Sequence, residues 1–149
     1  MIDVNNEIVK NSKKISVSLS GGADSAILFY HACDVLPDKT FIPWSGYDTR
    51  RPDSILYAME VYQFVKNSYP NVNILPHHTF KYTTTSCNAG DGTKNWDWKK
   101  DSKSVAHHKA EYKLWEKHKF DFTLNGMTSN TPLDAIKKFK MDIDTGNGI

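Results

Sequence analysis

Residues 18–30, SLSGGADSAILFY, place two adjacent glycines between an alternating stretch of apolar residues and an apolar helical pattern. Adjacent glycines cost conformational entropy, so we expect them where the backbone turns sharply or where another group comes close to it. Residues 15–19 alternate apolar side chains with serines, which predicts a short strand before the glycines. Residues 23–36 fit a largely buried helix that ends at Pro37. The stretch is therefore a strand, a tight turn and a helix.

The rest of the chain continues to alternate between strands and helices. We expect further strands at 39–44, 72–75 and 120–124, and further helices at about 53–69, 102–118 and 133–139. This order predicts an α/β fold, a mostly parallel twisted sheet of four or five strands with helices on both faces. Residues 45–54 are expected to form a loop and residues 79–101 a long loop or insertion, because neither shows a usable periodicity.

The composition is that of one soluble globular domain. The chain has 149 residues, of which 39% are hydrophobic and 24% are charged. Its formal net charge of +2 gives no argument for nucleic-acid binding. No segment approaches the roughly 20 apolar residues of a membrane helix, and the polar N-terminus has no signal-peptide core. We therefore expect a single cytoplasmic domain over residues 1–149, without a membrane or nucleic-acid partner.

The glycine turn has the chemistry of a phosphate site. A helix that begins after such a turn presents unpaired backbone N–H groups and the positive end of its dipole, where an anion fits. Gly21 and Gly22 leave no Cβ in the way, and Ser20 and Ser25 add hydroxyl groups. Asp24 either caps the helix or holds a Mg²⁺ ion that the phosphates also bind. The turn contains no lysine and no GxGxxG pattern, which disfavours a Walker-type or dinucleotide site.

Residues 20–25, Ser-Gly-Gly-Ala-Asp-Ser, resemble the SGGxDS PP-loop of the ATP pyrophosphatases, which belong to the adenine nucleotide alpha-hydrolase superfamily. The match covers all six residues and lies between the first strand and the first helix. The broad order of strands and helices agrees over most of residues 14–139. The resemblance implies that the turn grips the phosphates of ATP together with Mg²⁺. It also implies cleavage between the α and β phosphates, which adenylates an acceptor and releases pyrophosphate. A helix N-cap alone would need neither the second glycine nor the extra hydroxyls.

Other motifs indicate which group of this superfamily the chain resembles. Residues 41–65 look like the cyano-deazaguanine synthases, and also like the phosphoadenosine phosphosulfate reductases. The cysteine-rich zinc motif of the first group and the arginine-rich and cysteine motifs of the second are missing. The chain looks shorter than a complete member, so we expect either a minimal form or one that lacks a C-terminal portion.

Three hypotheses follow from these resemblances. The main one is an ATP pyrophosphatase like the cyano-deazaguanine synthases, acting on an unknown small-molecule acceptor. The first alternative is a reductase-like protein that binds the sulfonucleotide, for which Cys87 is the candidate redox cysteine, since Cys33 lies in an apolar helical pattern. The second alternative is a nucleotide-binding module without catalysis, in which a homodimer is one arrangement left open.

The predicted site residues follow from these hypotheses. Asp24 and Ser25 are the predicted catalytic residues, and Asp24 is also the predicted Mg²⁺ ligand. The two histidine pairs, 77–78 and 107–108, match none of the usual zinc spacings, so we expect no transition-metal site. The residues predicted to bind the nucleotide are Ser18, Ser20, Gly21, Gly22, Asp24, Ser25, Ser45, Gly46 and Gly126, and those predicted to meet the acceptor or pyrophosphate are Arg50, Arg51 and Lys81. For the arginines, the alternative is a solvated surface pair beside acidic neighbours.

Overall fold

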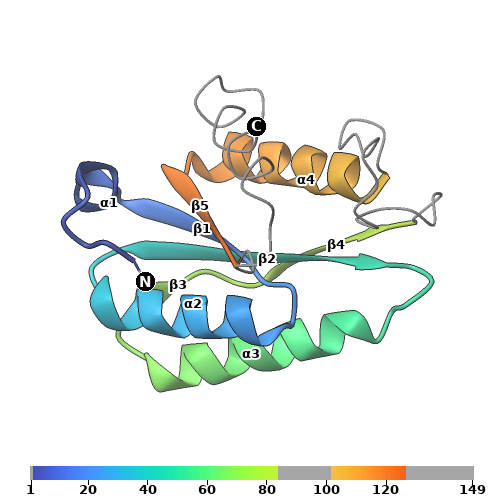
Figure 1. The fold of residues 1–149 in the computed structure, drawn as a ribbon, viewed down its shortest axis with the longest axis horizontal. Coiled ribbons are helices and arrows are strands. Elements are labelled where there is room, and N and C mark those ends of the chain that lie inside the picture. The colour runs from blue at the N-terminus through green and yellow to red at the C-terminus, as the bar shows by residue number, and fades with distance from the viewer. Residues whose placement is uncertain (1, 84–101, 127–149) are drawn as a thin grey trace, which may run out of the picture.

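The computed structural model describes residues 2–83 and 102–126, and its strands form one parallel sheet (Figure 1). The strands are β1 (Lys14–Ser18), β2 (Thr40–Asp48), β3 (Asn73–Ile74), β4 (His78–Tyr82) and β5 (Phe122–Asn125). β1 lies between β5 and β2, while β3 and β4 both pair with the other edge of β2. Every pairing is parallel, which confirms the predicted α/β fold and the size of its sheet.

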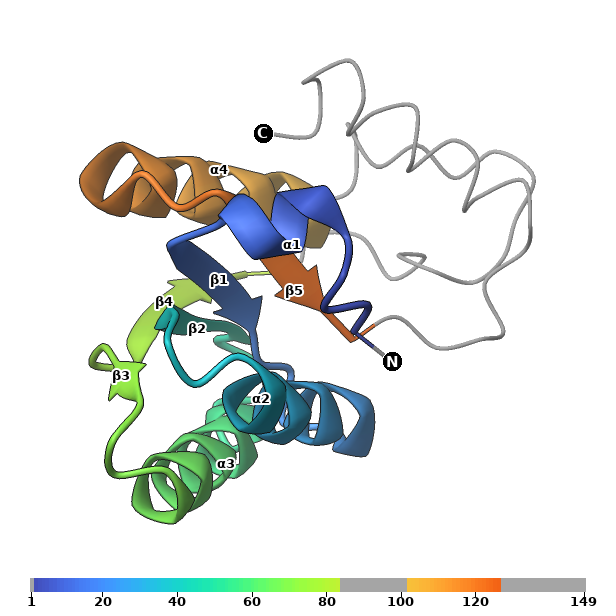
Figure 2. The same ribbon diagram turned by 90° about the vertical axis from the view of Figure 1, so that its left-hand side faces the viewer.

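Helices cover both faces of the sheet, as predicted. α2 (Ala23–Val35) and α3 (Ser54–Ser68) lie side by side on one face, and α4 (Ser102–His118) lies on the opposite face (Figure 2). The short α1 (Glu7–Asn11), which the sequence did not predict, precedes β1. None of the helices in the described part of the chain is long and apolar enough to cross a membrane. The predicted helix at 133–139 lies outside the described residues.

The alternation of side chains along β1 and β2 divides the core in two. Ile15 and Val17 face α2 and α3, where they join the larger apolar cluster with Phe29. Trp44 belongs to the smaller cluster under α4, and its indole Nε1 donates a hydrogen bond of 2.7 Å to the hydroxyl of Ser16. Serine is accepted at this fully buried position because its hydroxyl has a partner.

Two predicted loops are partly strand. β2 continues through residues 45–48, and β4 occupies residues 78–82, so the loop predictions were wrong at residues 45–48 and 79–82. Pairing with a neighbouring strand, and not apolar periodicity, extends both segments. Residues 84–101, the rest of the predicted insertion, lie outside the described residues.

β3 and β4 form one interrupted edge strand. Phe41 of β2 pairs with Ile74 of β3. Trp44 is three residues after Phe41, but it pairs with His78, which is four residues after Ile74. The edge strand therefore contains one extra residue between the two segments, as in a bulge. Pro76 lies in this interruption, where its missing N–H removes no ladder hydrogen bond.

Replacing Trp44 by Phe should lower the free energy of unfolding by about 1–3 kcal/mol, because the buried Ser16 hydroxyl loses its partner and the smaller ring leaves a void. Chemical denaturation of the single variants and of the Trp44→Phe/Ser16→Ala double variant measures the coupling. The double variant should lose less stability than the sum of the single variants. Strict additivity would contradict the hydrogen bond.

Candidate functional site

The glycine turn is fixed by close packing against α3. The Leu19 N–H donates to the Trp44 carbonyl at 2.9 Å, and the chain then leaves the sheet. Gly21 has a φ of +83°, a conformation that side chains disfavour. A Cβ at this position would lie 3.0 Å from Tyr57 Cβ and 3.2 Å from the Ala58 nitrogen. Both backbone conformation and lack of space therefore require glycine here.

Two serine hydroxyls close the turn from inside. The Ser25 hydroxyl donates to the Gly22 carbonyl at 3.1 Å and accepts from the Ser20 N–H at 3.2 Å. The two serine hydroxyls lie 3.1 Å apart, and the Ser20 hydroxyl accepts from the Gly22 N–H at 3.2 Å. Ser25 is buried, whereas Ser20 is exposed. Of the two predicted phosphate ligands, Ser20 thus faces solvent and Ser25 holds the turn together.

The first turn of α2 presents unpaired backbone donors. Gly22 makes no side-chain cap, and the first hydrogen bond entering the helix runs from the Ala26 N–H to the Gly22 carbonyl at 3.2 Å. Within the described residues, the N–H groups of Ala23, Asp24 and Ser25 have no hydrogen-bond acceptor. These donors lie at the positive end of a 13-residue helix. The arrangement can accept an anion.

Asp24 lies exposed in this same turn of α2. Its carboxylate makes no ion pair within the described part of the chain. A carboxylate beside an anion site repels phosphate unless a cation lies between them, and Mg²⁺ is typically held by one or two carboxylates plus phosphate oxygens. No group of three or more metal-ligating side chains occurs in the described residues. Asp24 is thus a carboxylate that could share a Mg²⁺ ion with phosphate oxygens, and its role as a ligand stays a prediction.

Gly126, at the end of β5, touches the first turn of α2. A Cβ there would lie 2.8 Å from the Ser25 nitrogen and 3.0 Å from Ser25 Cα. These are backbone atoms that cannot move aside separately from the helix. The structure therefore brings Gly126 to the glycine turn, where the sequence placed it, and gives a steric reason for glycine at this position.

Ser18 is the last residue of β1, and Ser45 lies within β2, one residue beyond the register partner of Ser18. Ser18 is half-buried and is paired in register with Trp44 on one side and Asn125 on the other. Ser45 is 1% exposed, and its hydroxyl donates to the Leu19 carbonyl at 2.6 Å. Ser45 is therefore buried beneath the turn and hydrogen-bonded to it, and its predicted role at the nucleotide stays a prediction.

Gly46 does not face open space. A Cβ built on Gly46 would run into the ring of Phe80, which lies on the neighbouring strand β4. The Phe80 ring thus covers the position that the sequence assigned to the nucleotide. The loop prediction for residues 45–54 was wrong here, because Gly46 lies within a paired strand, and its role at the nucleotide stays a prediction.

The three predicted basic residues lie further along the sheet edge. The Arg50 guanidinium pairs with the Asp48 carboxylate at 3.1 Å, and the Arg50 N–H also donates to it at 3.0 Å. Lys81 is exposed on β4 opposite Tyr47, beyond the level at which β1 ends. Arg51 is exposed in the turn before α3. The Arg50 contacts favour the surface-pair interpretation for that residue.

Sequence reasoning missed His77. Its Nε2 lies 2.8 Å from the Ser45 hydroxyl, and its ring stacks on Tyr62 with ring centres 5.2 Å apart. Burial, followed by the charge of His78, lowers the pKa of His77 from 6.5 to about 4. No local pattern around residue 77 indicates this contact, which depends on the pairing of β2 with the interrupted edge strand.

Titratable side chains also line the inner side of α4. The ring of His107 lies 5.1 Å from the rings of both Phe80 and Tyr82. Glu111 accepts a hydrogen bond from the Thr123 hydroxyl, and burial raises the pKa of its carboxyl. These contacts join α4 to the sheet on the face opposite α2.

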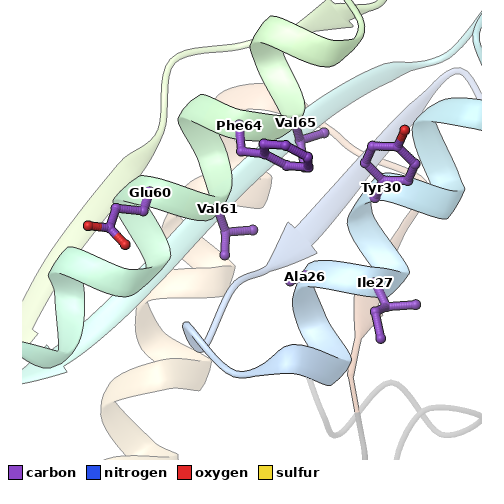
Figure 3. A pocket seen from close by; sticks show the side chains of 7 residues that line it. All are labelled: Ala26, Ile27, Tyr30, Glu60, Val61, Phe64 and Val65. Atoms are coloured by element: carbon purple, nitrogen blue, oxygen red, sulfur yellow. The ribbon is translucent and has the colours of Figure 1, made fainter.

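An apolar groove lies between α2 and α3, apart from the glycine turn (Figure 3). It has a volume of about 480 Å³, and Glu60 is its one charged lining residue. The other lining residues are Ala26, Ile27, Tyr30, Val61, Phe64 and Val65. This groove lacks the polar groups that a phosphate needs. The homodimer that the sequence left open is not tested by the groove, and it stays a prediction.

Comparisons with known proteins support the fold alone. No protein-family model matches the sequence, and no curated protein matches it significantly. A solved structure, the crystal structure of protein Rv1636 from Mycobacterium tuberculosis H37Rv, is similar with a TM-score of 0.51 and 16% identity. The match covers 87% of this chain and 90% of that chain. At this identity the likeness supports the α/β fold with its parallel sheet, and it does not extend to an activity.

Replacing Gly126 by Ala should lower the free energy of unfolding by about 1–3 kcal/mol, because the new methyl group meets helix backbone. Gly22→Ala is the matched control, since a Cβ there meets only the Ser20 Oγ at 3.3 Å. Chemical denaturation should show the larger loss for Gly126→Ala. An equal or smaller loss would contradict the close contact between β5 and α2.

The lowered pKa of His77 predicts a pH-dependent stability. The unfolded chain takes up a proton at this residue below pH 6.5, whereas the folded chain resists it down to about pH 4. The free energy of unfolding should therefore fall as the pH falls from 6.5 to 4. Denaturation at several pH values should show a shallower dependence for His77→Gln. Equal dependence in both proteins would contradict the burial of a neutral imidazole.

Proposed function

We propose that this chain binds an adenine nucleotide through its phosphates at the N-terminus of α2. The observation that carries this proposal is the row of unpaired N–H groups at Ala23, Asp24 and Ser25, next to a turn that only glycine can form at Gly21. Backbone donors at a helix start bind phosphate because the helix dipole adds to the hydrogen bonds. The choice of an adenine nucleotide rests on the resemblance of residues 20–25 to the PP-loop.

The residues of the turn have distinct roles in this proposal. The backbone N–H groups of α2 donate to the phosphate oxygens, and the exposed Ser20 hydroxyl rotates to join them. Asp24 holds a Mg²⁺ ion that neutralises part of the phosphate charge. The buried Ser25 keeps the turn closed. This replaces the catalytic role that the sequence suggested for Ser25.

Binding without catalysis is the function that the geometry supports best. The first turn of α2 offers donors for a phosphate, but Arg50, one of the three residues predicted to meet an acceptor, pairs with Asp48. The other two, Arg51 and Lys81, are exposed, and Lys81 lies beyond the level at which β1 ends. No second set of groups converges on the turn within the described residues.

An ATP pyrophosphatase is the second candidate, and the position of Asp24 favours it. A Mg²⁺ ion held there would supply charge neutralisation for a departing pyrophosphate. A sulfonucleotide reductase is supported less. Burial raises the pKa of the Cys33 thiol to about 12, which makes it a poor redox group. Cys87 lies outside the described residues.

Calorimetric titration with ATP in the presence of Mg²⁺ tests the proposed site. The wild type should bind, and Asp24→Asn should weaken binding about tenfold, which corresponds to about 1.4 kcal/mol. Without Mg²⁺ the same substitution should strengthen binding, because it removes a repulsive charge. Asp34→Asn, at the exposed far end of α2, is the control and should change neither affinity.

The outcomes separate the candidates. Absence of ATP binding by the wild type would refute the proposed function. Tighter binding of phosphoadenosine phosphosulfate than of ATP, with sulfite released in the presence of a thiol reductant, would favour the reductase-like alternative. AMP and pyrophosphate among the products of incubation with ATP would favour the pyrophosphatase. Binding that yields no product is the expected result for a nucleotide-binding module.

A further inference from the structure

A buried hydrogen-bond chain runs from His77 to the glycine turn. The Ser45 hydroxyl has one hydrogen, which it donates to the Leu19 carbonyl at 2.6 Å. The contact of 2.8 Å between Ser45 Oγ and His77 Nε2 must then be donated by the histidine. The network therefore assigns the proton of neutral His77 to Nε2.

The series of hydrogen bonds continues through one planar peptide group, the one between Leu19 and Ser20. The Leu19 carbonyl and the Ser20 N–H belong to the same planar peptide group, so fixing one direction fixes the other. The Ser20 N–H donates to the Ser25 hydroxyl at 3.2 Å, and that hydroxyl donates to the Gly22 carbonyl at 3.1 Å. The orientation of the Leu19 carbonyl is thereby transmitted into the first turn of α2.

His77 is itself held by two elements. It lies in the interruption of the edge strand between β3 and β4, and its ring stacks on Tyr62 of α3 at an interplanar angle of 28°. The same helix α3 packs against Gly21 with its first turn. His77 thus has a fixed position relative to both the turn and the helix that flanks it.

We infer that His77 is a positioning residue for the phosphate-binding turn: through Ser45 it sets the orientation of the Leu19–Ser20 peptide and of the donors that follow. The inference rests on the proposed function for its binding readout. It adds a residue from the edge strand that the local motif at 20–25 does not contain.

Two substitutions separate the hydrogen bond from the packing. His77→Gln keeps an N–H donor but loses the ring that stacks on Tyr62, while His77→Phe keeps a ring but loses the donor. We expect His77→Phe to weaken binding of ATP with Mg²⁺ about 3- to 10-fold, the value of one hydrogen bond, and His77→Gln to stay within about 3-fold of the wild type. In a Ser45→Ala background, His77→Phe should have no further effect on affinity.

The exchange rate of the Ser20 amide hydrogen gives a second readout without ligand. It should rise in His77→Phe and in Ser45→Ala, and remain near the wild-type rate in His77→Gln. Affinities that follow global stability, or effects of Ser45→Ala and His77→Phe that add, would overturn the inference. If the wild type binds no ATP, the proposed function fails, and the Ser20 exchange rates alone then confirm or overturn the positioning role.

Discussion

Close approach of backbone to backbone at the start of α2 is the constraint on which the site depends. Gly126, directly after β5, lies against the Ser25 backbone, while Gly21 lies against Tyr57 and Ala58 of α3. A side chain at either position would push the helix start away from the sheet edge. The two contacts hold the first turn of α2 between β5 and α3, and its N–H groups face outward as a result. Any phosphate bound there meets donors that are already in place, which lowers the cost of ordering on binding.

The two faces of the sheet differ in the polarity of the side chains that they carry. The face under α2 and α3 is apolar, with Phe29 and Phe41 meeting edge to face, and it gives the turn a rigid support. The face under α4 carries histidines and the buried carboxyl of Glu111. The glycine turn lies on the apolar side, and the hydrogen bond from His77 to Ser45 links it to a titratable group.

The sequence predicted what is local and missed what depends on strand register. The glycines and serines of residues 20–25 predicted the turn from the local sequence. The alternation of strands and helices predicted the parallel sheet with helices on both faces. Gly46 and Phe80 lie far apart in the chain, and their contact follows from the register of β2 against β4. The same pairing, with one extra residue at the interruption, places His77 at Ser45. No periodicity within either segment encodes these contacts, so residues 45–48 and 79–82 were taken for loops.

The internal hydrogen bonds of the turn bear on the choice between binding and catalysis. The Ser20 and Ser25 hydroxyls satisfy each other and the turn backbone, and these internal hydrogen bonds hold the shape of the loop. Donors held in this way would favour binding of a nucleotide's ground state, and acceleration would require groups that act more strongly on the transition state. Asp24 is the one exposed charged residue in the first turn of α2. A Mg²⁺ ion held at Asp24 strengthens ground-state binding as well as any later charge separation. Catalysis would therefore require further groups that approach a bound phosphate from the side opposite α2.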